Sequence, residues 1–145
     1  MEVITIMNDK IIEWDLSDFY DGLNDPKIAG DIQEITTLAD EFNRDVKGNL
    51  QGPLLKSDTL LDWYKKYEDI SEKVFYLQSY SNLIYSTNNL DDEVKAFFSK
   101  VEEFTVKIQE KLIFFNLELN EISDEKFNEL ISSPELENYT NALKN

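Results

Sequence analysis

The sequence predicts an all-α protein, with a long antiparallel helical hairpin, a preceding packed helix and short C-terminal helices. Three observations support this fold class. The 145 residues include only four Gly and three Pro, so few residues interrupt helices. Apolar residues recur at steps of three and four over two stretches of about thirty residues. The short connection Asn88-Asn89-Leu90 between those stretches requires two adjacent antiparallel helices.

The segment before residue 25 lacks a long helical pattern. Residues 3–7 and 11–14 are rich in β-branched side chains, which favours short extended segments. Residues 14–20 have apolar positions three apart, which suits a single helical turn. Residues 21–24 combine Asp, Gly and Asn and predict a turn. We therefore expect the regular helices to begin after this segment.

The first long helix is expected over residues 26–47. Asp25 can cap the free amides at its start, and Pro26 loses no hydrogen bond at the first helical position. Lys47 supplies a basic last turn and Gly48 a left-handed terminator. The expected apolar stripe consists of Ile28, Ile32, Ile35, Ala39, Phe42 and Val46.

The two helices of the predicted hairpin follow a loop at residues 49–56. The first begins at Ser57 or Asp58 and runs to about Thr87. The second opens with an acidic turn at residues 91–93 and continues to about residue 122. The first helix has seam positions at Leu60, Trp63, Tyr67, Ile70, Val74, Leu77, Ser81 and Ile84. The second has them at Val94, Phe97, Val101, Phe104, Ile108, Leu112, Phe115, Leu119 and Ile122. Such seams require an antiparallel partner.

The end of the chain predicts two short helices, over residues 124–132 and 134–143. Ser133 and Pro134 would open the second of them. The sequence contains no repeat, low-complexity tract or linker, so we expect residues 1–145 to form a single helical domain.

Composition excludes most catalytic chemistry for this chain, because it contains neither His nor Cys. Without them there is no Ser-His-Asp or Cys-His nucleophile, zinc finger or thiol redox centre. Acidic pairs such as Glu68 and Glu72 more often mark a solvated helix face than a metal site. We therefore expect no catalytic, metal or cofactor-binding residues, although a carboxylate-only hydrolase stays open.

The net charge of −16 disfavours two classes of partner. A strongly negative surface repels nucleic acid and anionic membranes. No run of residues is long and apolar enough to predict a membrane span, and the N-terminus does not resemble a signal peptide. Together with the absence of Cys, these features predict a cytoplasmic protein.

The second hairpin helix is unusually apolar near its C-terminal end. Residues 112–119 place apolar side chains on more than one face, and three helices need not cover them all. We therefore expect Ile113, Phe114 and Leu117 to dock against protein outside this chain. The tyrosines and phenylalanines of the hairpin are expected mainly to fill its core.

Several short motifs occur in the order found in one peptidase family. The motifs are Trp14-Asp15-Leu16-Ser17-Asp18-Phe19-Tyr20, Asp25-Pro26, Phe42 with Lys47-Gly48, Tyr67-Glu68, Tyr80-Ser81, Tyr85-Ser86-Thr87, Phe114-Phe115-Asn116-Leu117-Glu118-Leu119, Pro134-Glu135-Leu136 and Tyr139. This pattern resembles the opening of oligoendopeptidase F and its relatives among the thimet-oligopeptidase-like zinc metallopeptidases.

The resemblance implies a helical N-terminal domain that restricts access to the catalytic channel of a peptidase acting on short peptides. The family binds zinc through His-Glu-x-x-His, a motif that this chain does not contain, so we expect the chain to be inactive alone. Tyr80 and Tyr85 are candidates for peptide contact. The expected partner is the missing catalytic domain or an equivalent protein surface. A fragment, a truncated product and a stand-alone relative all stay open, as does a stand-alone acidic interaction module that binds a partner helix or basic peptide.

Overall fold

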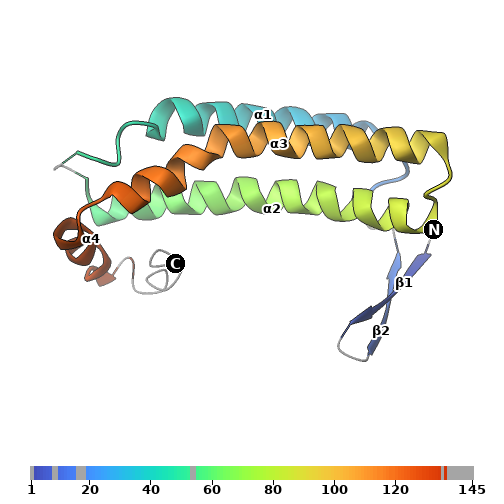
Figure 1. Ribbon diagram of the computed structural model, residues 1–145, viewed down its shortest axis with the longest axis horizontal. Helices are drawn as coiled ribbons and strands as arrows, with labels where there is room; N and C mark the ends of the chain where they lie inside the picture. Colours follow the sequence, from blue (N-terminus) through green and yellow to red (C-terminus); the bar gives the residue numbers. More distant parts are fainter. Residues whose placement is uncertain (1, 8–9, 16–18, 53–54, 135, 137–145) are drawn as a thin grey trace. The chain divides into compact units, whose positions relative to one another are not determined.

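The computed structural model describes residues 19–52, 55–134 and 136, and the backbone of residues 2–7 and 10–15. It confirms the all-α fold class, with a long helical hairpin and a packed helix before it (Figure 1). The described elements in order are β1 (Glu2–Met7), β2 (Lys10–Asp15), α1 (Pro26–Val46), α2 (Ser57–Thr87), α3 (Asp92–Glu121) and α4 (Asp124–Ile131).

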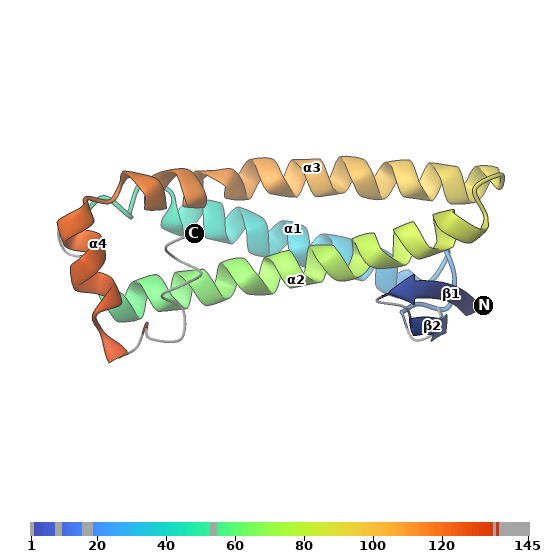
Figure 2. The same cartoon turned by 60° about the horizontal axis from the view of Figure 1, so that its bottom comes forward.

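A two-stranded antiparallel hairpin precedes the helices. β1 pairs with β2 so that Val3 lies opposite Trp14 and Glu2 opposite Asp15 (Figure 2). This confirms the extended segments but corrects the helical turn predicted from residue 14, because Trp14 and Asp15 belong to β2. Cross-strand pairing of β-branched and aromatic residues outweighs a weak three-residue periodicity. Residues 16–18 of that predicted turn lie outside the described part of the chain.

The predicted helix boundaries are confirmed to within one or two residues, and local hydrogen bonds explain them. At the start of α1, Asp25 Oδ1 accepts a hydrogen bond of 2.9 Å from the backbone amide of Lys27. Asp91 Oδ1 does the same for the Glu93 amide, at 2.8 Å, before α3. Gly48 follows α1 with φ 84°, a left-handed conformation that favours glycine. Of the second short C-terminal helix, only residues 134 and 136 are described, both in a 3₁₀ turn.

The chain divides into two compact units instead of presenting one cluster of contacts. Unit 1 comprises Met1–Thr37 and Ser71–Ile108, and unit 2 comprises Leu38–Ile70 and Gln109–Asn145. Each of α1, α2 and α3 therefore contributes one segment to each unit. The α2 and α3 segments within each unit run antiparallel, as the short connection between them requires.

The core of unit 1 is an aromatic–aliphatic cluster around Tyr80. The Tyr80 ring lies 4.8 Å from that of Tyr20 and 6.0 Å from that of Phe97, both edge to face. Buried aliphatic side chains complete the cluster, namely Ile28, Leu77, Ile84, Val94 and Val101. A residue of the loop before α1, Tyr20, is thus part of the core.

The core of unit 2 is built around Phe42 of α1. Its ring centroid lies 5.6 Å from that of Phe114 and 5.2 Å from that of Phe115. The Phe115 ring is fully buried and also lies 5.1 Å from the Tyr67 ring of α2. Other buried members are Ala39, Val46, Leu50, Leu60, Ile70, Leu112, Ile122 and Leu130. All the predicted seam positions of α2 and α3 are buried or half-buried.

Candidate functional site

The residues predicted to dock a partner separate into two exposed side chains and one buried side chain. Ile113 and Leu117 are 58% and 57% exposed, one helical turn apart on α3. Phe114 is buried against Phe42, so it does not form part of an exposed docking surface, and this corrects the prediction. We refer to Ile113 and Leu117 as the α3 docking pair.

Hydrogen bonds fix the part of α3 that carries this pair. The Asn43 side-chain amide of α1 donates to the Lys111 carbonyl at 2.8 Å, and Lys111 Nζ forms an ion pair with Asp40. Glu118 Oε1 accepts from the Gly48 amide at 2.8 Å, and its carbonyl accepts from the Gln51 side chain at 2.7 Å. These contacts hold one side of α3 against α1 and the loop after it. The docking pair therefore lies on a segment of α3 that is attached to α1 and the following loop at both of its ends.

The charges that flank the docking pair along α3 are negative. Glu110 lies three residues before Ile113, and Glu121 lies four residues after Leu117; both are exposed. Residues at these spacings neighbour one another on a helix surface. The resulting face has an aliphatic centre and acidic ends, which suits an apolar partner surface with basic flanks.

The two tyrosines proposed for peptide contact differ in accessibility. Tyr80 is only 1% exposed, beneath Tyr20 and Phe97, and this burial raises the pKa of its hydroxyl. It is among the residues that line a cavity beside Tyr20, but at 1% exposure it offers too little surface to bind a peptide, which corrects that expectation. Tyr85 is half-buried and stacks on Phe98 at a centroid distance of 4.3 Å. Of these two tyrosines, Tyr85 is the more exposed.

Sequence reasoning missed a tyrosine–carboxylate contact next to this core. The Tyr20 hydroxyl donates to Asp31 Oδ2 at 2.6 Å, and burial together with this bond raises its pKa far above the ordinary value. A cavity of about 430 Å³ adjoins Tyr20, lined also by Leu23, Ile84 and Val94. No sequence motif joins residues 20 and 31, so only the fold reveals the pair.

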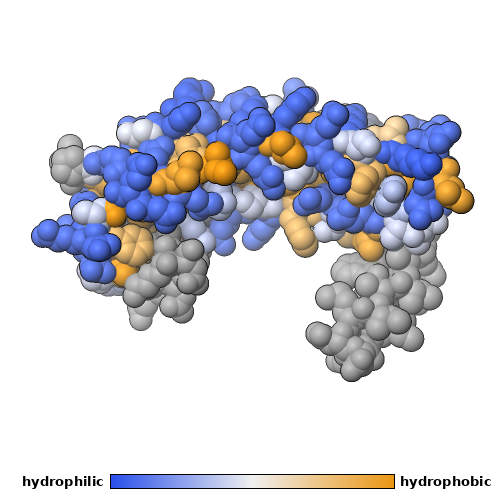
Figure 3. Space-filling view, in the orientation of Figure 1, coloured by the Kyte–Doolittle hydropathy of each residue, from blue (hydrophilic) through white to orange (hydrophobic). Residues whose placement is uncertain are grey.

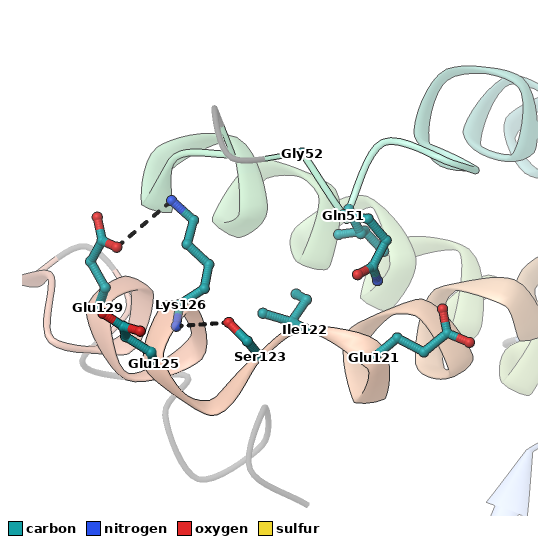
Figure 4. Close-up of a pocket in the computed structure, with 9 residues that line it drawn as sticks. Gln51, Gly52, Glu121, Ile122, Ser123, Glu125, Lys126 and Glu129 are labelled. Carbon is teal, nitrogen blue, oxygen red and sulfur yellow. Dashed lines mark hydrogen bonds and ion pairs between the residues drawn. The ribbon is translucent and has the colours of Figure 1, made fainter.

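A second cavity lies in unit 2 between α4 and the loop after α1. It has a volume of about 530 Å³, and Figure 4 shows Gln51 and Gly52 on one side and the α4 residues on the other. Lys126 Nζ lies 3.9 Å from Glu129 Oε2. Glu121, Glu125 and Glu129 give the rim an acidic excess, but all three are exposed, so solvent screens their charge. This rim favours a basic group only weakly.

The zinc ion implied by the peptidase resemblance does not fit the residues present. The chain contains no His or Cys, the usual zinc ligands. Within the described ranges, no three Asp or Glu side chains are grouped to hold a metal ion. We therefore assign no metal chemistry to this chain.

Among the residues that the structure describes, no helix has the length and apolar character of a membrane span.

Comparison of the chain with protein-family models, with curated protein sequences and with solved structures finds no match.

Proposed function

We propose that this chain acts by docking onto another protein through the α3 docking pair, and has no catalytic role of its own. The carrying observation is that Ile113 and Leu117 stay more than half exposed on the same segment of α3 whose neighbouring side chains Leu112, Phe114 and Phe115 are buried in the core of unit 2. Neither aliphatic side chain can form a hydrogen bond with water. A partner that covers both would stabilise the complex by about 25 cal/mol for each Å² of apolar surface removed from water. A segment of α3 that is attached at both ends would lose little conformational freedom on binding.

The resemblance to oligoendopeptidase F gives the proposal its specific form. In that form the chain is the N-terminal domain that restricts substrate access, and the docking pair contacts the catalytic domain, which carries the zinc motif. The half-buried Tyr85 is the remaining candidate for peptide contact. Hydrolysis of short peptides would then belong to the complex, and this chain would supply shape and positioning.

Binding in trans tests this form. A separately produced catalytic domain of an oligoendopeptidase F-like peptidase is titrated with the chain by isothermal calorimetry. We expect saturable binding by the wild-type chain and loss of about tenfold or more in affinity for Ile113→Glu/Leu117→Glu, because each change buries a charge in an apolar contact.

A charge-matched control separates docking from general repulsion. Gln33→Glu/Thr37→Glu adds two carboxylates one turn apart at exposed positions of α1 in unit 1, and it should bind as the wild type does. Circular dichroism checks that each variant is folded. Equal binding by wild type and the docking-pair variant, or no binding by either, would contradict the peptidase form.

A second candidate is a stand-alone acidic module that binds a basic amphipathic helix. The net charge of −16 and the acidic ends of the docking face favour it. A helical peptide with two leucines one turn apart and lysines at both ends provides the probe. Binding that weakens with salt and requires Ile113 and Leu117, without binding of the catalytic domain, would favour this candidate.

A further inference from the structure

One segment of α2 in unit 1 departs from the composition of the rest of the chain. From Val74 to Leu90 there is no Asp, Glu, Lys or Arg, although 30% of all residues are charged. Buried positions explain only part of this, because several residues of the segment face solvent. Exposed helix faces in a highly charged protein normally carry charged side chains. The missing charge therefore requires an explanation outside the core.

The solvent-facing residues of this segment lie on one side of α2. Phe75, Ser79, Asn82 and Ser86 follow one another at steps of four, three and four. Phe75 is 70% exposed, Asn82 and Ser86 are exposed, and Ser79 is half-exposed. We call these four residues the uncharged face. In Figure 3, pale and orange atoms gather along the lower edge of the right-hand half, where Figure 1 draws this part of α2.

The composition of the uncharged face is that of an interface centre. Protein interfaces are depleted of charge at their centre and enriched in aromatic residues, with charged residues at the rim. The uncharged face has an exposed Phe at its start and small hydrogen-bonding side chains along the rest of its length. It extends over twelve helical residues, or about 17 Å from Phe75 to Ser86 at a rise of 1.5 Å per residue.

We infer that the uncharged face is the contact between two copies of this chain. Two copies of α2 can pack antiparallel about a two-fold axis between residues 79 and 82. In that register Phe75 of one copy faces Ser86 of the other, and Ser79 faces Asn82. The largest side chain thus meets a small one, and a hydroxyl meets an amide. A two-fold interface needs this kind of self-complementarity.

Electrostatics also favour this face for contact between copies. Two chains of charge −16 repel each other, so they can approach most closely where charged side chains are missing. In the same register the helical residues that pair across the axis are 74–87 of each copy, a range without Asp, Glu, Lys or Arg, so no like charges oppose each other within it. Salt should strengthen the dimer, because it screens the repulsion between the remaining surfaces.

Charge exchange across the two-fold axis tests the inference. Sedimentation velocity measures the dimer fraction over a range of concentrations at low and high salt. Ser79→Glu alone and Asn82→Lys alone should each weaken the dimer by about tenfold or more, because like charges then meet near the axis. The double variant Ser79→Glu/Asn82→Lys should restore the dimer, because each Glu then faces a Lys of the other copy.

The control is Ile113→Glu, which adds a charge in unit 2 and should leave the dimer unchanged. Circular dichroism confirms folding of every variant. A wild-type chain that stays monomeric at all concentrations overturns the inference, as does a dimer that Ser79→Glu does not weaken or that the double variant does not restore. A dimer broken by Ile113→Glu alone also overturns it. The catalytic domain is not present in this experiment, so its outcome is separate from that of the proposed function.

Discussion

The core of unit 1 contains buried tyrosine rings, whereas the buried aromatic rings in the core of unit 2 are phenylalanines. Tyr20 and Tyr80 are 4% and 1% exposed in unit 1, and the Tyr20 hydroxyl needs Asp31 as an acceptor. Phe42, Phe114 and Phe115 fill unit 2 and have no polar group to satisfy. The same three helices therefore make one core whose buried rings include hydroxyl groups and one whose buried rings carry none.

The exposed faces of the two units also differ in the side chains that they carry. Unit 1 carries the uncharged face on α2, with a single exposed aromatic ring and small polar side chains. Unit 2 carries two exposed aliphatic side chains on α3 between carboxylates. Different interface chemistries at separate places are consistent with two different partners, a second copy and another protein.

The largest expected effect tests the core of unit 2. Phe115→Ala should lower the free energy of unfolding by about 3–5 kcal/mol, because the fully buried ring leaves a cavity among Phe42, Tyr64 and Tyr67. Urea denaturation followed by circular dichroism measures the loss. Leu117→Ala on the same helix, at a side chain 57% exposed, should cost about 0.5 kcal/mol or less. Similar losses for both variants would contradict the assignment of Phe115 to the core.

The polar dependence of unit 1 is tested at Tyr20. Tyr20→Phe removes the hydrogen bond to Asp31 and should cost about 1.5 kcal/mol, the lower value for a bond to a charged group. Because the pKa of Tyr20 is raised in the folded chain, its contribution to stability is complete below pH 10 and is lost at higher pH, where this tyrosine ionises in the unfolded chain. The variant should show a smaller fall in that range.

Tyr85→Phe is the matched control for this experiment. The Tyr85 ring stacks on Phe98 and is half-buried. The free energy of unfolding of the Tyr85→Phe variant should therefore differ from that of the wild type by about 0.5 kcal/mol or less. Denaturation of both variants at pH 7 and pH 10.5 gives the comparison. Equal losses at the two tyrosines would show that the Asp31 contact does not stabilise unit 1.

A smaller effect is expected at Ser81, where unit 1 buries a hydroxyl. Ser81 is 2% exposed, and its Oγ has no hydrogen-bond partner among the described residues. Ser81→Ala should raise the unfolding free energy by about 1 kcal/mol, because it removes an unsatisfied polar group. Ser86→Ala, at an exposed position of the same helix, corrects for helix propensity and should give a smaller gain. A destabilised Ser81→Ala variant would indicate that the hydroxyl has a partner.

The smallest effect is a pH dependence at the start of α1. The amides of Asp21 and Lys27 donate to Asp25 and lower its pKa below 3.8. Its contribution is therefore complete above pH 3.8 and is lost as the pH falls through the folded-state pKa. Asp25→Asn keeps a capping side chain but removes this titration, so its acid unfolding should be less steep than that of the wild type. Indistinguishable acid titrations would contradict the assignment.

Local sequence patterns were sufficient for the helices but not for every side chain on them. The periodic stripes, the cap at Asp25 and the acidic turn at residues 91–93 predicted α1, α2 and α3, since helix periodicity and end groups act over a few residues. Trp14 and Asp15 were predicted to open a helical turn and instead end strand β2. The pairing of Trp14 with Val3 depends on a residue eleven positions away, which a local pattern does not contain.

The sequence by itself determined the helical class, the chemistry excluded by the lack of His and Cys, and the apolar excess near residue 113. Tertiary structure decided which of those apolar side chains are covered. Phe114 and Phe115 are adjacent and both buried, because α3 contacts Phe42 of α1 with both rings and Tyr67 of α2 with Phe115. A helix with two packing partners buries a wider arc than a helix with one, and this leaves only Ile113 and Leu117 exposed there. The width of that arc depends on where the neighbouring helices lie, which residue order along α3 does not specify.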